Sequence, residues 1–290
     1  NPINNDIHWI SNDQIRGNPI VSLNSAPLDI SGTLAAELFQ HKDSVVLTSA
    51  TLSTEGNFEY FKSRVGVGGD SEELLVGSPF DYQKAALLLI PEDMPPPNSD
   101  QYVDAMVRVL TDLGTTMNGH TMALFTSYAS LRAVAQRLRA PLMGQDIQVL
   151  AQSIDGSAQQ LMTRFAEEPN SVLLGTASFW EGVDLPSGLL KALVLTRLPF
   201  AVPTDPVVMA RSNQYENPFS EFSVPQAVLR FRQGFGRLIR NKADRGTIVI
   251  MDNRITGKSY GSSFLKSIPP CTLKPSSLTN TGQLASQWLA

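Results

Sequence analysis

Three polar side chains near the end of the chain have types and a spacing that suit phosphate chemistry. Gln233, Arg237 and Arg240 stand at positions i, i+4 and i+7 of segment 226–240, QAVLRFRQGFGRLIR. In a helix this spacing would place all three on one face. Each guanidinium group offers a planar fork of donors that matches anionic oxygens, so this face would suit a phosphate. The segment alone leaves an alternative open, an ordinary basic surface helix whose arginines are solvated or paired with carboxylates.

Two glycines interrupt the same segment. Gly234 and Gly236 each cost a helix about 1 kcal/mol relative to alanine. A helix that keeps such residues usually needs another group to approach its backbone closely. We therefore expect tight packing against the helix at these positions.

The composition of the 290-residue chain is that of a globular protein with one large domain or two ordinary ones. Hydrophobic residues make up 42% and charged residues 17%, which is enough apolar material for a core and too little charge for a disordered chain. The formal net charge is -4, yet segment 225–258 holds eight Lys or Arg residues against two acids. That basic segment could meet the phosphates of a nucleotide or of a nucleic acid.

Cysteine and histidine usage argues against a metal centre in this chain. The one cysteine, Cys271, excludes an internal disulfide and any metal or iron–sulfur site built from several cysteines of this chain. His8, His41 and His120 are scattered without metal-ligand spacing. No apolar run approaches the ~20 residues of a membrane span, and no signal peptide opens the chain. We expect a cytoplasmic protein and, because the chain starts at Asn1 without methionine, a fragment of something longer.

Short apolar segments alternate with amphipathic ones along most of the chain. The predicted strands cover residues 8–10, 19–23, 44–48, 85–90, 120–125, 148–151, 171–174, 191–196 and 247–251. The predicted helices cover residues 32–39, 56–64, 100–113, 129–138, 157–165, 224–239, 260–268 and 281–288. Short strands that are apolar on both faces and alternate with helices indicate an α/β fold, a parallel sheet with helices on both faces.

Segment 67–80, which is rich in glycine, serine and acidic residues, is the best candidate for a linker. It would separate an N-terminal part, residues 1–66, from a larger domain at residues 81–270. Residues 271–290 would then form a C-terminal tail with a helix.

Hydroxyl and aromatic residues follow two of the predicted strands, at the sheet edge where α/β proteins bind ligands. Ser49 and Thr51 follow the third strand. Ser127 and Tyr128 follow the fifth strand and begin a helix, whose first N–H groups favour an anion. A tyrosine ring can also stack a base, so single-stranded nucleic acid is a candidate ligand. The alternative is that Ser127 only caps the helix.

The loop at residues 175–186, GTASFWEGVDLP, combines aromatic, acidic and glycine residues. Glu181 and Asp184 could accept hydrogen bonds from a ribose hydroxyl or from the arginines. Phe179 and Trp180 would be costly to expose for stability alone. The alternative, which we favour for both aromatics, is that they anchor the loop in the core.

A Gly-Lys-Ser sequence at residues 257–259 looks like the end of a phosphate-binding loop. The G-x-x-x-x-G-K-[ST] pattern would need glycine at position 252, where the chain has Asp252. Without that first glycine the match is weak. Phosphoryl transfer from a nucleoside triphosphate needs a phosphate cradle with Mg²⁺ as well as positive charge at the γ-phosphate. Arginines without a cradle indicate that the cradle lies on another domain.

Four stretches, in this order, resemble the motifs of the DinG/XPD-like group of superfamily-two helicases. They are TSATL at 48–52 for motif III, FTSY at 125–128 for motif IV, FWEGVDLP at 179–186 with RLPF at 197–200 for motif V, and QGFGRLIR at 233–240 for motif VI. The pair of motifs V and VI in this order is far more specific than any one motif. The resemblance covers roughly residues 26–269.

The resemblance implies a RecA-like fold and a motor of two such domains, with ATP and Mg²⁺ in the cleft and single-stranded DNA across both. In the group, the phosphate-binding loop, the DEAH box and, in many members, a four-cysteine 4Fe-4S insertion all precede motif III. We therefore expect this chain to be the end of the first motor domain plus the whole second one. By itself it would hydrolyse no ATP, and its partners would be DNA and the missing motor domain.

The resemblance also implies roles for individual residues. On the nucleotide side these are Gln233, Arg237 and Arg240 at the γ-phosphate, with Glu181, Gly182 and Asp184 at the nucleotide. On the DNA side they are Ser127, Tyr128, Thr176 and Trp180, with Ser49 and Thr51 relaying between the two sites. The whole protein would be an ATP-dependent DNA helicase, moving 5′ to 3′ in DNA repair or replication. The alternative is a RecA-like interaction module that has lost motor function.

Overall fold

The structure is a computed structural model that describes residues 6–15, 18–49, 51–54, 56–168, 170–180 and 185–290. The chain forms two compact units. The first contains Asn1–Val76 and Phe200–Leu229, and the second contains Gly77–Pro199 and Arg230–Ala290.

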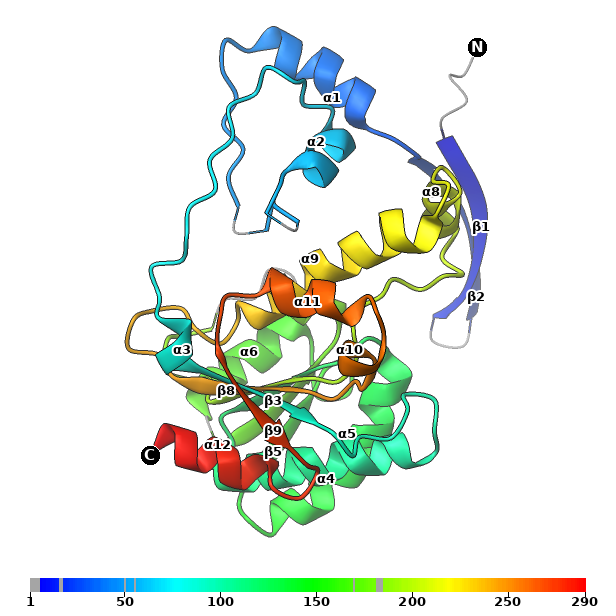
Figure 1. Ribbon diagram of the computed structural model, residues 1–290. Coiled ribbons are helices and arrows are strands. Elements are labelled where there is room, and N and C mark those ends of the chain that lie inside the picture. The colour runs from blue at the N-terminus through cyan, green and yellow to red at the C-terminus, as the bar shows by residue number, and fades with distance from the viewer. Residues whose placement is uncertain (1–5, 16–17, 50, 55, 169, 181–184) are drawn as a thin grey trace. The chain divides into compact units, whose positions relative to one another are not determined.

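The second unit is built on a seven-stranded sheet in the described part of the chain, with the order β5-β6-β4-β7-β8-β3-β9 (Figure 1). Its strands are β3 (Ala86–Pro91), β4 (Thr121–Leu124), β5 (Gln148–Ala151), β6 (Ser171–Gly175), β7 (Ala192–Leu195), β8 (Gly246–Ile250) and β9 (Thr272–Ser276). All neighbouring strands pair in parallel. Strands β3, β4, β6, β7 and β8 are buried along their whole length, as expected for a parallel sheet covered on both faces. The predicted α/β fold is confirmed.

Helices cover both faces of this sheet (Figure 1). The helices of the second unit are α3 (Tyr82–Ala85), α4 (Gln101–Thr116), α5 (Tyr128–Met143), α6 (Ala158–Glu167), α7 (Ala177–Trp180), α10 (Arg254–Gly257), α11 (Gly261–Ser267) and α12 (Thr281–Leu289). Helix α9 (Val224–Phe235) runs from the first unit into the second. The side chains Met106, Leu110, Leu131 and Val134 of α4 and α5, with Ala285 of α12, join one apolar core cluster against the sheet.

Helix α4 is tied to the carboxyl ends of two strands by one tyrosine. The hydroxyl of Tyr102, which is almost fully buried, donates to the carbonyl of Met251 (2.7 Å) and also contacts that of Thr196. These carbonyls directly follow β8 and β7. Burial raises the pKa of Tyr102 above its usual value, so the group stays a neutral donor. The bonds therefore fix α4 at the sheet edge where ligands bind in α/β folds.

The first unit contains a two-stranded antiparallel ribbon of β1 (Asp6–Ile15) and β2 (Asn18–Pro27). Its helices are α1 (Ser31–Glu37), η1 (Phe39–His41), α2 (Glu59–Val65), α8 (Pro206–Ser212) and the π-helical turn η2 (Phe219–Ser223). Arg211 of α8 donates to the carbonyls of Leu28 and Pro27, at 3.0 Å each. These bonds join segment 200–229 to the end of the ribbon, which explains why that segment belongs to the first unit. The sequence did not predict that the chain passes back into the first unit there.

Some predicted elements differ from the structure. Residues 44–48 form no strand, and no strand among the described residues pairs with them. Without a partner an apolar run gains no ladder hydrogen bonds, and Val46 is 85% exposed. In residues 271–290, which were predicted as a tail with a helix, the helix is present as α12. The same segment also contains an unpredicted strand, β9, which pairs with β3, and α12 packs on the unit's core. The prolines around β9 hid an edge strand, which is the position in a sheet that tolerates them.

Candidate functional site

The short helix α7 lies at the centre of the candidate site. It follows β6 directly, so it stands at the carboxyl edge of the sheet. Gly175, the last residue of β6, has no room for a side chain, because a Cβ there would lie 2.4 Å from the ring of Phe179. This glycine lets Phe179 fold back into the core and so turns the chain sharply into α7.

The C-terminal end of α7 joins three predicted motifs. The indole Nε1 of Trp180 donates to the carbonyl of Phe125 (3.1 Å), just after β4. The carbonyl of Trp180 accepts from Nη2 of Arg237 (2.8 Å). A Cβ on Gly234 would lie 2.6 Å from Cζ3 of Trp180, so the indole packs directly on the backbone of α9. The expectation of a close approach is thus confirmed at Gly234. At Gly236 it was wrong, since a Cβ there would meet nothing nearer than 3.5 Å.

Trp180 is 3% exposed, and Phe179 is fully buried. The core-anchor interpretation of both aromatics is therefore confirmed. In this structure the indole offers no face on which a base could stack, so the assignment of Trp180 to the DNA side can hold only through its backbone. The indole is buried because glycine at position 234 has no side chain, and the ring fills the space that a side chain would need.

Arg237 and Arg240 do not continue the helix that carries Gln233. Helix α9 ends at Phe235, and Arg237 donates its backbone N–H to the carbonyl of Gly234 (3.1 Å) in a following turn. The prediction of one helix to residue 239, with all three side chains on one helical face, was wrong. Gln233 lies half-buried in the last turn of α9, and both arginines lie half-buried in the loop after it.

Asp244 holds the loop of Arg240 in place. One carboxylate oxygen accepts the backbone N–H groups of Arg240 (2.8 Å) and Asn241 (3.0 Å), and the other accepts the hydroxyl of Ser187 (2.6 Å). Burial alone would raise the pKa of Asp244, but these hydrogen bonds outweigh it and the pKa is lowered. Burial lowers the pKa of Arg240, and Asp244 partly offsets this. Asp244 thus joins the segment after motif V to motif VI, a role that no sequence motif indicates.

The N-terminal end of α7 and the start of α5 hold the other predicted DNA-side residues. Thr176 is buried, and both its N–H and its hydroxyl donate to the side chain of Gln152 (2.7 and 2.9 Å). Ser127 caps α5 by accepting the N–H of Ser130 (3.2 Å). Tyr128 is 44% exposed. The structure therefore brings Ser127, Tyr128 and Thr176 to one sheet edge.

Of the five remaining predicted residues, the structure describes two. Glu181, Gly182 and Asp184 fall outside the described residues. Ser49 and Thr51 belong to the first unit, where their hydroxyls are 3.2 Å apart and the N–H of Thr51 donates to Ser49 Oγ (3.2 Å).

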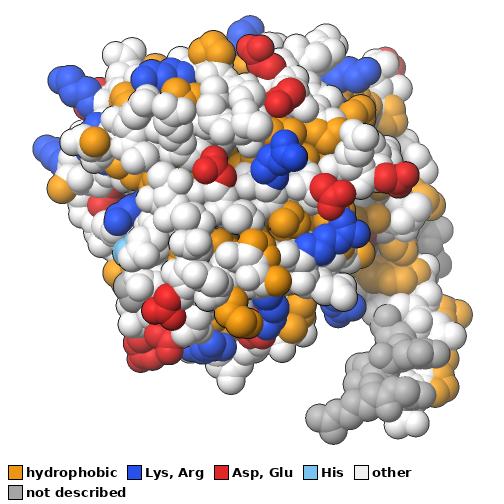
Figure 2. All heavy atoms as spheres, turned by 90° about the horizontal axis from the view of Figure 1, so that it is seen from below, with side chains coloured by type: hydrophobic (Ala, Val, Ile, Leu, Met, Phe, Trp, Pro, Cys, Tyr) orange, Lys and Arg blue, Asp and Glu red, His pale blue; other side chains and the backbone are white. Residues whose placement is uncertain are grey.

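Much of the charge in the basic segment 225–258 is used inside the second unit. Besides Arg237, Arg245 lies over the Trp288 ring (5.4 Å) and donates to its carbonyl (2.5 Å). Arg254 forms an ion pair with Asp252 (2.5 Å). On the face drawn in Figure 2, basic and acidic side chains are intermixed, without a large area of one sign. Arg237, Arg245 and Arg254 of this segment thus make contacts within the second unit.

The loop after β8, which contains the Gly-Lys-Ser sequence, has a structural role. Asp252 is fully buried and accepts the N–H of Leu198 (2.9 Å) as well as the guanidinium of Arg254. The carboxylate thus fills the place where a phosphate-binding loop would need an open turn. This supports the exclusion of residues 252–259 as a phosphate cradle.

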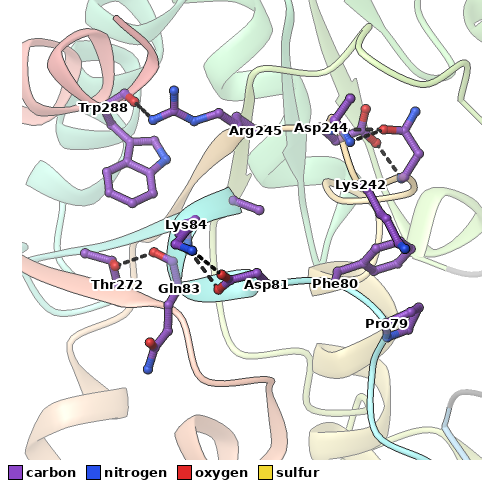
Figure 3. A pocket seen from close by; sticks show the side chains of 13 residues that line it. Pro79, Phe80, Asp81, Gln83, Lys84, Lys242, Asp244, Arg245, Thr272 and Trp288 are labelled. Atoms are coloured by element: carbon purple, nitrogen blue, oxygen red, sulfur yellow. Dashed lines mark hydrogen bonds and ion pairs between the residues drawn. The ribbon is translucent and has the colours of Figure 1, made fainter.

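A pocket of about 820 Å³ lies at the opposite, amino edge of the sheet, where β3, β8 and β9 begin (Figure 3). Its lining includes Lys84, paired with Asp81 (3.1 Å), and Arg245 beside Trp288. The loop that contains Asp244, residues 241–245, forms part of the pocket wall. The pocket thus adjoins the anchor of Arg240 and is separate from α7.

Neither a metal-binding cluster nor a membrane-spanning helix is present among the described residues. No group of three or more His, Cys, Asp or Glu side chains there could hold a metal ion. Likewise, no helix in the described ranges has the length and apolar character that crossing a membrane requires.

Known proteins resemble this chain in sequence and in fold. A family model for the helicase C-terminal domain matches residues 110–271, more than half of the chain. The chain belongs to this family, in the DinG/XPD-like group of superfamily-two helicases. It is 37% identical to the 3′-5′ exonuclease DinG of Bacillus subtilis over 90% of the chain and 29% of that protein. It is also 37% identical to the ATP-dependent DNA helicase YoaA of Escherichia coli, over 84% of the chain and 38% of that protein.

Another relative is the ATP-dependent DNA helicase DinG of Photobacterium profundum, 36% identical over 90% of the chain and 39% of that protein. The chain therefore spans well under half the length of these relatives. Among solved structures, an XPD helicase superposes with a TM-score of 0.66 at 18% identity, covering 87% of this chain and 46% of that one. This structural likeness establishes the RecA-like helicase fold.

Proposed function

We propose that this chain supplies the second motor domain of an ATP-dependent DNA helicase, which couples ATP hydrolysis to movement along single-stranded DNA. The movement would run 5′ to 3′, and the protein would serve DNA repair or replication. One observation carries the proposal, the hydrogen bond from Arg237 to the carbonyl of Trp180 (2.8 Å). It joins the residue expected at the γ-phosphate to the loop expected at the DNA.

The arginines would supply charge rather than a binding cradle. A positioned arginine at the γ-phosphate contributes on the order of 10³–10⁵ in rate in related phosphoryl transfers. Arg237 is positioned by Trp180, and the backbone of Arg240 by Asp244. Mg²⁺ would neutralise phosphate charge when ATP is bound. The described residues hold no acidic cluster for that ion, so the other motor domain would hold it together with the phosphates.

The coupling would run through α7. Its C-terminal carbonyl bonds to Arg237, and its first turn adjoins Thr176 on the DNA side. A helix of four residues is too short to bend between its ends, so a shift of Arg237 on cleft closure would move the DNA-side loop with it. ATP binding would thereby change the affinity of this domain for DNA.

The first unit gives separate support for a larger motor. Val45, Val46 and Leu47 form an apolar run that is exposed in this structure. Such a run fits a central strand of a parallel sheet, where both faces are covered. We propose that the run joins the sheet of the first motor domain, as motif III would require.

Strand displacement by a full-length protein that carries this chain tests the proposal. We expect ATP-dependent unwinding of a duplex with a 5′ single-stranded tail and none with a 3′ tail. Unwinding of neither duplex, together with no DNA-dependent ATP turnover, would favour the interaction module. Unwinding of the 3′-tailed duplex alone would contradict the proposed direction.

A further inference from the structure

Gln152 is a buried polar residue to which the motifs assign no role. It directly follows β5 and is 6% exposed. Its Oε1 accepts the N–H of Thr176 (2.7 Å) and the Thr176 hydroxyl (2.9 Å), and its Nε2 donates to Ser178 Oγ (2.7 Å) and more weakly to the Tyr128 hydroxyl (3.4 Å). A single side chain thus ties together the loops that follow β4, β5 and β6.

The direction of each hydrogen bond follows from the chemistry of the partners. The backbone N–H of Thr176 can only donate, so the amide atom beside it must be the oxygen. The other amide atom is then the NH₂ group, which can only donate. Ser178 Oγ and the Tyr128 oxygen must therefore accept, and their own hydrogens point away from Gln152.

Both residues are exposed, and both follow strands at the carboxyl edge of the sheet. A hydroxyl whose oxygen already accepts a protein donor is left with its hydrogen for an outside acceptor. The oxygens of a nucleic-acid phosphate can only accept, and protein hydroxyls are common donors to them. Ser178 and Tyr128 are thus prepared as a pair of donors by one buried amide.

We propose that Gln152 is a positioning residue for single-stranded DNA, which orients Ser178 and Tyr128 as donors to backbone phosphates. The inference rests on the proposed function and deepens it. It adds Ser178 as a DNA contact and gives the buried Thr176 a role in holding the loop rather than in touching DNA.

The Gln152→Glu variant tests the orientation with little change in shape. The glutamate can still accept from Thr176, but it now accepts from Ser178 as well and turns the Ser178 hydrogen inward. Gln148→Glu is the matched control, because Gln148 begins the same strand, is exposed, and gains the same charge. Ser178→Ala removes the contact directly.

The assay is the affinity of a full-length protein that carries this chain for a fluorescent oligothymidylate, together with DNA-stimulated ATP turnover. We expect Gln152→Glu to weaken binding about tenfold and Ser178→Ala about fivefold, since the net contribution of a typical hydrogen bond corresponds to factors of this size. Gln148→Glu should weaken binding less than about twofold. The DNA concentration for half-maximal turnover should rise by the same factor, while the maximal rate stays within about twofold. A purely structural role would instead lower the maximal rate and the thermal midpoint together.

The double variant Gln152→Glu/Ser178→Ala should bind no more weakly than Gln152→Glu, because both changes remove the same contact. Unchanged affinity in Gln152→Glu, or an equal loss in Gln148→Glu, would overturn the inference and leave the proposed function standing. If Gln152→Glu does not fold, unchanged affinity in Ser178→Ala would overturn the inference. A wild-type protein that binds no single-stranded DNA would overturn the proposed function as well.

Discussion

Replacing Gly234 by alanine should destabilise the second unit, although alanine is the better helix former. A Cβ at this position would lie 2.6 Å from Cζ3 and 2.7 Å from Cε3 of Trp180. Carbon atoms in good contact are about 3.5–4.0 Å apart, so the ring or the helix must move by about 1 Å. Overpacking of this kind costs about 1–3 kcal/mol, which outweighs the gain of about 1 kcal/mol from helix propensity.

Gly236 provides the matched control two residues away. A Cβ there would meet only the Arg232 carbonyl at 3.5 Å and that of Gln233 at 3.7 Å, which are ordinary contacts. Gly236→Ala should therefore leave the free energy of unfolding unchanged or raise it by up to about 1 kcal/mol. The two variants carry the same chemical change, so their difference isolates the Trp180 contact.

Urea unfolding followed by circular dichroism measures both variants. A double-mutant cycle with Trp180→Phe sharpens the test, because the smaller ring gives the new methyl group space. The cost of Gly234→Ala should fall by about 1 kcal/mol or more in that background, as for residues in direct contact. Equal stability of Gly234→Ala and Gly236→Ala would refute the packing argument.

Two further predictions concern the Asp244 carboxylate and the activity of the 290-residue chain by itself. The pKa of Asp244 is lower in the folded state than in the unfolded chain, so its stabilising contribution is present above the unfolded pKa of about 3.9 and is lost as the pH falls through the folded value. Asp244→Asn should therefore lower the free energy of unfolding at pH 7 and flatten its fall between pH 5 and pH 3 in acid titrations; an unaltered pH profile would refute this. The 290-residue chain alone should turn over no ATP and bind single-stranded DNA weakly, with an affinity that falls steeply with salt in a filter-binding titration. Tight, salt-insensitive binding of single-stranded DNA would contradict the expectation that this chain forms only half of the DNA-binding groove.

The sequence predicted most of the sheet because parallel strands leave a strong local signal. Strand β5 was predicted to the residue, and the limits of β4 and β6 to within two, since each is a short apolar run between polar turns. The helix predicted at residues 157–165 is present as α6, and Ser157 caps it in a capping box with Gln160. These features depend on neighbours in sequence and can be seen without the fold.

The failures have a common physical cause, the influence of residues distant in sequence. Residues 44–48 have the composition of a strand but find no partner strand among the described residues. Helix α9 ends at Phe235, and Arg237 in the following loop contacts Trp180, which is 57 residues away in the sequence. Gln152 has no motif because its role comes from loops after three different strands. Local patterns cannot contain such contacts.

The central claim is that Arg237 and Arg240 act on the phosphate that is transferred. The most direct test is ATP turnover at saturating single-stranded DNA in full-length proteins with Arg237→Ala or Arg240→Ala, beside Arg245→Ala as a control that lies over Trp288. We expect the first two changes to lower turnover by about 10³ or more while ATP binding stays nearly intact, and the control to keep wild-type turnover. Wild-type turnover in both Arg237→Ala and Arg240→Ala would contradict the claim.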